Sequence, residues 1–265
     1  MREKAIGIFD SGVGGLTVLK EMERILPNED IIYFGDTARV PYGNKSKTTI
    51  IKFSTENILF LLKKKVKTVV VACNTASSLA LDYLKDIFSV PILGVVEAGA
   101  NKALELSENK KIAVIGTRST IISGSYEHAM KKNDKSVKVY SKACPLFVPL
   151  VEEGILNGKI VDGVMEMYLR NLKNMDIDVI ILGCTHYPLL KKEIARYLKN
   201  ICIVDSAEQV ALHTKKVLLQ NDILRIRKVN GKRDFYVTDE PTGFMKLAKL
   251  FLKRDIAKPR VISVS

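Results

Sequence analysis

The chain has 265 residues, of which 47% are hydrophobic and 27% are charged, and its formal net charge is +13. These values are typical of a globular protein with a core, and they exclude a disordered or fibrous chain. No run reaches the roughly 18 apolar residues of a membrane-spanning helix, and the first residues lack a signal-peptide pattern. We therefore expect a cytoplasmic protein without membrane contact.

The first predicted unit is a strand at residues 6–9, followed by Asp10, Ser11 and a glycine-rich turn before a helix at residues 18–26. This turn is not a dinucleotide fingerprint, because Thr17 stands where glycine or alanine is needed. The glycines would let backbone N–H groups approach a small anion. Asp10 has two interpretations, a cap of the following helix or a functional group.

A strand at residues 31–34, a Pro41-Tyr42-Gly43 loop and a helix at residues 50–62 follow. The apolar run from Val69 then ends at Cys73 and is followed by a helix at residues 76–87. We expect the next strand at residues 92–97, ending in an acid.

The chain then repeats this order. A strand at residues 112–115 ends near Thr117, and another lies at residues 137–140. Two prolines at residues 144–149 predict a rigid connection and not a helix. A buried strand from Val179 ends at Gly183 and is followed by Cys184, which lies 111 positions after Cys73. Pro188 suits the first turn of a helix, and a strand at residues 201–205 follows.

The repeat predicts an α/β fold of two similar lobes, each a mainly parallel sheet flanked by helices, related by a pseudo-two-fold with the site between them. We place residues 1–97 and 208–265 in the first lobe, which carries Cys73. Residues 98–207 form the second, which carries Cys184. The tail strand at residues 233–239 and a final helix would return to the first lobe.

Two thiols at matching strand ends would face each other across a cleft. A thiolate can remove a proton from one face of a carbon while a thiol returns one to the other, which is racemisation without a cofactor. A lone cysteine is more often a small buried hydrophobe, and we interpret Cys144 and Cys202 so. The four cysteines form no C-x-x-C pair, and Cys184 with His186 lacks partner ligands, so we expect free thiols and no metal.

Four motifs carry a family resemblance: Asp10-Ser11-Gly-Val-Gly-Gly, Pro41-Tyr42-Gly43, Ala72-Cys73-Asn74-Thr75-Ala and Gly183-Cys184-Thr185-His186-Tyr-Pro188. In this order they resemble the glutamate racemases, which belong to the cofactor-independent aspartate/glutamate racemases. The resemblance implies that Cys73 and Cys184 are the acid/bases. It also implies that Asp10 assists Cys73 and that His186, tuned by Glu152, assists Cys184. The sequence does not tell Glu152 from Glu153.

The resemblance also implies a glutamate-binding site and further properties. The substrate-binding residues it implies are Asp10, Ser11, Tyr42, Gly43, Asn74, Thr75, Thr117, Thr185 and His186, with Thr120 as a possible addition. It implies that glutamate is the small-molecule substrate, that there is no cofactor, that D-glutamate supplies peptidoglycan synthesis and that the protein is a homodimer.

Three alternatives remain open. Aspartate racemase of the same family acts on a substrate one methylene shorter, which a pocket discriminates by only ~1–3 kcal/mol. A cysteine-dependent hydrolase would need only one thiol and one base. A polyanion-binding protein would use the +13 charge, but the lysines are scattered and no nucleic-acid motif accompanies them, so we do not expect nucleic acid as a partner. A positive field would still favour anionic small substrates.

Overall fold

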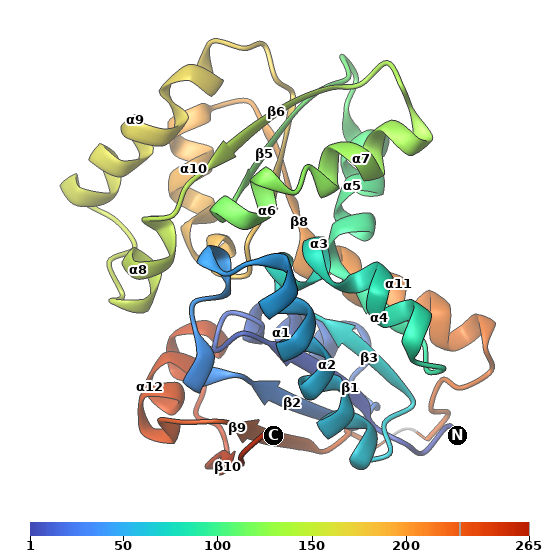
Figure 1. Ribbon diagram of the computed structural model, residues 1–265. Helices are drawn as coiled ribbons and strands as arrows, with labels where there is room; N and C mark the ends of the chain where they lie inside the picture. The colour runs from blue at the N-terminus through green and yellow to red at the C-terminus, as the bar shows by residue number, and fades with distance from the viewer. Residues whose placement is uncertain (228, 265) are drawn as a thin grey trace.

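The computed structural model describes residues 1–227 and 229–264. Within these residues the chain forms two parallel β-sheets, each flanked by helices, in two lobes that lie one above the other in Figure 1. The predicted fold class is thereby confirmed. None of the helices in this part of the chain is both long enough and apolar enough to cross a membrane.

In the described residues, the first sheet has the order β10-β9-β2-β1-β3-β4 and the second β6-β5-β7-β8, and every neighbouring pair is parallel. The strands of the first sheet are β1 (Ile6–Asp10), β2 (Ile31–Gly35), β3 (Thr68–Val71), β4 (Ile92–Gly94), β9 (Arg233–Val237) and β10 (Arg260–Val261). Those of the second are β5 (Lys111–Gly116), β6 (Lys138–Ala143), β7 (Val179–Gly183) and β8 (Cys202–Asp205).

The order β2-β1-β3-β4 in the first sheet recurs as β6-β5-β7-β8 in the second. Strands β3 and β7 therefore hold equivalent places, and each is fully buried because helices cover both faces of its sheet. Cys73 and Cys184 follow these strands by one or two residues. Because all strands are parallel, both cysteines lie at the carboxyl edge of their sheets, where open α/β folds place ligands.

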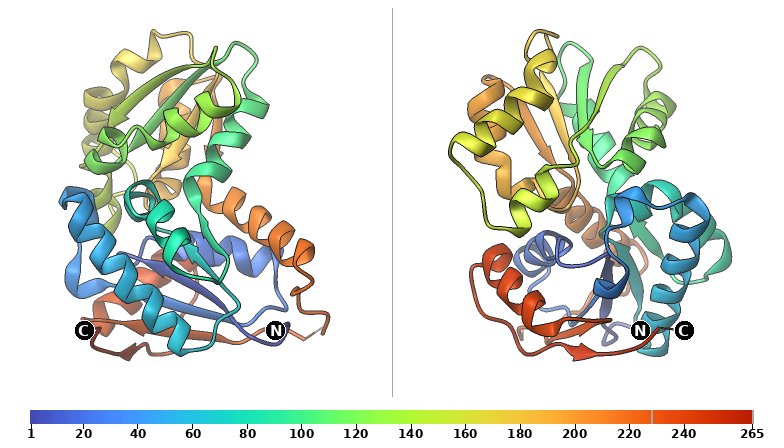
Figure 2. Two further views of the ribbon diagram at one scale, coloured as in Figure 1. Left: turned by 45° about the vertical axis from the view of Figure 1, so that its right-hand side comes forward. Right: turned by 60° about the vertical axis from the view of Figure 1, so that its left-hand side comes forward.

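Helices cover the sheets on both faces, as the two further views show (Figure 2). In the first lobe and its connections they are α1 (Leu16–Ile25), α2 (Lys47–Lys63), α3 (Asn74–Leu79), α4 (Leu81–Ile87), α11 (Ser206–Gln220) and α12 (Pro241–Leu252). The others are α5 (Val95–Leu106), α6 (Arg118–Ile122), α7 (Ser125–Asn133), α8 (Phe147–Glu152), α9 (Lys159–Lys173) and α10 (Lys191–Leu198). Short 3₁₀ helices are Thr37–Arg39, Tyr42–Asn44 and Tyr187–Leu190.

A single hydrophobic cluster joins the lobes. It contains Ile8 and Leu19 from one lobe and Ile180 and Phe147 from the other. Helix α11 packs against both α1 and α5, so the lobes also meet along a helix layer. The tail strand β9 pairs with β2, and α12 packs against α1. The domain boundaries near residues 97 and 207 stay a prediction.

Three predicted elements are wrong in detail. The helix predicted at residues 76–87 is two helices, α3 and α4, separated at Ala80. The strand at residues 92–97 ends at Gly94, and Val95 begins α5, whose buried face packs against α7 and α11. Tertiary packing there overrides the β-propensity of two valines. The connection at residues 144–149 contains the start of α8, with Pro149 in its first turn. Proline is tolerated there because its missing N–H would have no partner inside the helix.

Candidate active site between the lobes

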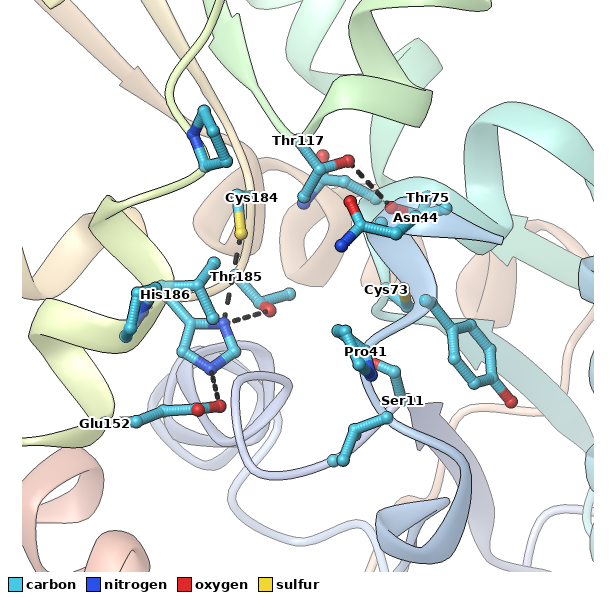
Figure 3. Close-up of a pocket in the computed structure, with 18 of the residues that line it drawn as sticks. Ser11, Pro41, Asn44, Cys73, Thr75, Thr117, Glu152, Cys184, Thr185 and His186 are labelled. Atoms are coloured by element: carbon cyan, nitrogen blue, oxygen red, sulfur yellow. Dashed lines mark hydrogen bonds and ion pairs between the residues drawn. The ribbon is translucent and has the colours of Figure 1, made fainter. Parts of the chain in front are cut away.

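A cavity of about 380 Å³ lies between the two lobes, a size suited to a small molecule. Both cysteines of the repeat border it, and Figure 3 shows them on opposite sides of the space. The predicted residues that line it are Ser11, Tyr42, Gly43, Cys73, Asn74, Thr75, Thr117, Glu152, Cys184, Thr185 and His186. Asp10 and Thr120 do not.

The two thiols are presented in the same way. Cys73 is the N-cap residue of α3 and is 6% exposed, and Cys184 directly follows Gly183 and is 5% exposed. Cys73 comes from the first lobe and Cys184 from the second. A molecule in the cavity is therefore reached by one sulfur from each lobe.

His186 and Glu152 lie on the Cys184 side (Figure 3). Nδ1 of His186 is 3.9 Å from the Cys184 sulfur, and Nε2 is 3.0 Å from Oε1 of Glu152. Burial would lower the pKa of His186, but its bonds to Cys184 and Glu152 outweigh this and raise the pKa to about 10. A protonated His186 places a positive charge beside the Cys184 sulfur. It is Glu152 whose carboxylate reaches His186, which answers the choice left open between Glu152 and Glu153.

Asp10 lies on the Cys73 side, fully buried and outside the cavity lining. Its Oδ2 accepts a hydrogen bond from the Gly12 N–H at 3.0 Å, and burial raises its pKa. Burial, with the nearby Asp10 carboxyl, raises the pKa of Cys73 to about 12, so Cys73 is held as a thiol. The structure thus places Asp10 at the end of β1, beside the strand that leads to Cys73, but not in the lining of the cavity.

The glycine-rich turn joins the lobes. A Cβ atom on Gly14 would lie 2.2 Å from Oγ1 of Thr185 and 2.6 Å from Nδ1 of His186. Thr17 donates a hydrogen bond to the Thr185 carbonyl at 3.1 Å. At Gly14 the absence of a side chain therefore serves close packing of the first lobe on the second. The approach of backbone N–H groups of this turn to an anion stays a prediction.

Tyr42 borders the cavity, but its hydroxyl is bound to other residues of its own lobe. The hydroxyl donates to Asp36 and accepts a hydrogen bond from Nδ2 of Asn57 at 3.1 Å. Asp36 is fully buried and also binds Arg39. The phenol of Tyr42 is thus already engaged by Asp36 and Asn57 within the first lobe.

Hydroxyl groups connect the lobes along the cavity wall. Oγ1 of Thr75 is 2.9 Å from Oγ1 of Thr117, which is 2.9 Å from Oγ1 of Thr120. Ser119 donates to the Gly43 carbonyl at 2.7 Å. Thr120 is buried behind this wall, so it supports Thr75 and Thr117 without lining the cavity.

Sequence reasoning missed two polar residues of the lining, Asn44 and Arg118. Arg118 is exposed and begins α6 directly after Thr117. The sequence signal that could have identified Arg118 as a lining residue is its position directly after Thr117, near the end of a predicted strand. Among residues 1–227 and 229–264, no group of three or more His, Cys, Asp or Glu side chains is placed to hold a metal ion.

Two repeated α/β units, each presenting one buried thiol to a shared cavity, define a two-lobed protein with a paired-cysteine site. Residues 6–214 match the sequence model of the family described as Asp/Glu/Hydantoin racemase. The chain belongs to this family.

Named relatives agree over nearly the whole chain. It is 46% identical to the glutamate racemase of Geobacter metallireducens over 94% of this chain and 93% of that protein. It is 47% identical to that of Aquifex aeolicus over 97% of both. The crystal structure of the glutamate racemase from Francisella tularensis in complex with D-glutamate superposes with a TM-score of 0.94 at 39% identity, covering 100% of this chain and 99% of that one.

Proposed function

We propose that this protein is a glutamate racemase that interconverts L- and D-glutamate by two-base proton transfer at Cα. The observation that carries the proposal is that Cys73 and Cys184 border one cavity from opposite lobes. The relatives described above, which are named glutamate racemases, support glutamate as the substrate. The reaction needs no external oxidant or reductant, because only a proton changes place.

Binding would use the polar groups of the cavity lining. The amide of Asn74 and the hydroxyls of Thr75 and Thr185 offer hydrogen bonds to carboxylates. Ser11 and the backbone of Gly43 lie on the first-lobe wall. Donors held by the fold need no reorganisation as charge grows on the α-carboxylate, which is the main way such a site stabilises a carbanion-like transition state.

In one direction Cys184 acts as the thiolate. Its sulfur takes the Cα proton, and the electron pair of the broken C–H bond delocalises into the α-carboxylate. The thiol of Cys73 then gives its proton to the opposite face of Cα. Cys184 ends as a thiol and Cys73 as a thiolate, which is the starting state for the opposite enantiomer.

The flanking groups give the two sulfurs different surroundings. The imidazolium of His186, held by Glu152, attracts a thiolate at Cys184. Asp10 and burial keep Cys73 protonated, and we propose that Asp10 assists its proton transfers. One thiolate and one thiol at rest are what a two-base reaction requires.

The test uses purified protein in heavy water with L-glutamate and no added cofactor. We expect D-glutamate with deuterium at Cα. Cys73→Ala and Cys184→Ala should each lose full turnover, while Cys202→Ala, which removes the exposed thiol outside the cavity, should keep it. The absence of inversion and exchange in the parent protein would end the proposal. A single mutant that racemises at the parent rate would exclude the two-base mechanism and favour single-cysteine chemistry.

Aspartate is the competing substrate. One methylene changes binding by only ~1–3 kcal/mol, so kcat/KM for L-aspartate and L-glutamate must be compared directly. We expect glutamate to be preferred. A higher kcat/KM for aspartate would replace the proposed substrate.

We further infer a role in supplying D-glutamate for peptidoglycan in the cytoplasm, with the protein as a homodimer. Rescue of a bacterium that requires D-glutamate would support the role. Sedimentation of the purified protein measures the oligomeric state, and a monomer at working concentration would contradict it.

A further inference from the structure

The side chain of Asn74 is held by a residue of the opposite lobe. The hydroxyl of Tyr126, on α7, is 2.6 Å from Oδ1 of Asn74 and 2.9 Å from Oγ of Ser206. Tyr126 and Ser206 are each 2% exposed. Oγ of Ser206 in turn lies 3.3 Å from the carbonyl of Leu182, two residues before Cys184.

The chemistry of the groups determines which atom donates and which accepts in these hydrogen bonds. The amide oxygen of Asn74 can only accept a hydrogen bond, so the single phenolic proton of Tyr126 is used on Asn74. The oxygen of Tyr126 is then the acceptor toward Ser206, whose single hydroxyl proton is shared between this oxygen and the Leu182 carbonyl. Burial raises the pKa of Tyr126, which keeps the phenol protonated for this purpose.

The direction determines which end of the Asn74 amide meets the cavity. Asn74 lines the cavity, and its Oδ1 is occupied by Tyr126. In residues 1–227 and 229–264 no hydrogen-bond partner for Nδ2 is found, and Nδ2 is not among the fully enclosed polar atoms without partners. The free end of the amide is therefore its NH₂ group, which only donates.

We propose that Tyr126 is a positioning residue that fixes the Asn74 amide so that Nδ2 donates to a carboxylate of the substrate. The inference rests on the proposed function, since it takes glutamate as the molecule bound. Without the phenolic hydroxyl, the amide can turn and present Oδ1 to the carboxylate, and two acceptors repel each other. Ser206 acts one step further away, by holding the Tyr126 oxygen.

The first test is Tyr126→Phe, which keeps the ring and removes the hydroxyl. The Asn74 bond to a charged carboxylate exists both before and during proton transfer. Its loss should therefore raise KM for glutamate about tenfold and change kcat less. Asn74→Ala should raise KM at least as much. In an Asn74→Ala background, adding Tyr126→Phe should change KM little, because the residue through which Tyr126 acts is gone.

Tyr187→Phe is the matched control. Tyr187 is fully buried in the same lobe, and its hydroxyl donates at 2.8 Å to the Cys144 carbonyl and not to Asn74. Whatever factor Tyr187→Phe changes in KM should be the same in the parent protein and in the Asn74→Ala background. If Tyr126→Phe also changes KM by the same factor in the parent protein and in the Asn74→Ala background, Tyr126 acts only on stability and the inference is overturned.

Asn74→Asp tests the amide orientation even if Tyr126→Phe fails to fold. The carboxylate can keep the bond from Tyr126, but it presents an acceptor where Nδ2 was. KM should rise more than in Asn74→Ala, and a KM equal to that of the parent would overturn the inference.

The rise in melting temperature that D-glutamate causes in each variant repeats the cycle with binding, and not rate, as the measured quantity. If the parent protein binds D-glutamate but does not invert it, only the proposed function is contradicted. Additivity of the variants in an active parent would contradict only the role of Tyr126. If the parent neither racemises nor binds glutamate, both are contradicted.

Discussion

Oε1 of Glu152 lies 3.0 Å from Nε2 of His186 and joins the end of α8 to the loop after β7. The ring of His186 is thereby held between the Cys184 sulfur and a carboxylate, and the ring is buried although the Glu152 side chain is 42% exposed. Both partners favour the charged imidazole. The pair thus keeps a positive charge beside the Cys184 sulfur.

Glu152→Gln removes the charge but keeps an oxygen that can accept the imidazole N–H. The pKa of His186, about 10 in the parent, should fall. The alkaline limb of the kcat/KM profile should then move to lower pH, and the maximum should drop about tenfold, the effect of weakening one hydrogen bond between charged groups. Glu153→Gln is the control, because it removes the same charge from a side chain that does not line the cavity. Equal profiles for the two variants would show that Glu152 has no such role.

The same shift links stability to pH. The folded pKa of His186, about 10, lies above its ordinary value of about 6.5. The stability it contributes is fully present below about pH 6.5 and is lost as pH rises through about 10. The unfolding free energy of both proteins can be measured by denaturation at about pH 6 and at about pH 9. Between these two pH values it should fall less for Glu152→Gln than for the parent. An equal fall would mean that Glu152 does not raise this pKa.

Gly14→Ala should separate the two lobes locally. Its Cβ would lie 2.2 Å from Oγ1 of Thr185, so Thr185 and His186 must shift. Such overpacking costs about 1–3 kcal/mol of stability, and displacement of a helper group by a fraction of an ångström can lower kcat more than tenfold. Circular-dichroism melting and initial rates measure both effects.

Gly163→Ala is the control for Gly14→Ala. Gly163 lies inside α9, and a Cβ there meets nothing within 4 Å. Alanine is favoured over glycine in a helix by about 0.5–1 kcal/mol, so this variant should melt higher and keep its rate. Parent activity in Gly14→Ala would contradict the packing role of that glycine.

Arg118 offers a cation at the cavity edge for an anionic substrate. Arg118→Gln should raise KM for glutamate by about threefold at low ionic strength and leave kcat unchanged, because an exposed charge contributes weakly and is screened by salt. The difference should disappear at high salt. Arg118→Lys should restore KM. Lys132→Gln, which changes the net charge equally but does not line the cavity, should have no effect. A KM for Arg118→Gln equal to the parent value at low salt would remove Arg118 from substrate capture.

Much of the fold could be predicted because its signals are local. The apolar runs before Cys73 and Cys184 correspond to β3 and β7, whose residues are buried on both faces. Local reasoning failed where packing reverses a propensity. Val95 has a β-branched side chain, yet it begins α5, since the apolar face of that helix is covered by α7 and α11.

The features of the site also fall into those that follow from local sequence and those that depend on tertiary packing. Residue type and spacing were enough to predict the two thiols, their equivalent places in a repeat and the glycine-rich and hydroxyl-bearing motifs. The folded chain was needed to show that Glu152 and not Glu153 reaches His186, that the Tyr42 hydroxyl turns to Asp36, and that Tyr126 holds Asn74 from the other lobe. Each of these depends on where a side chain points once distant segments meet. Spacing along the chain does not encode that direction.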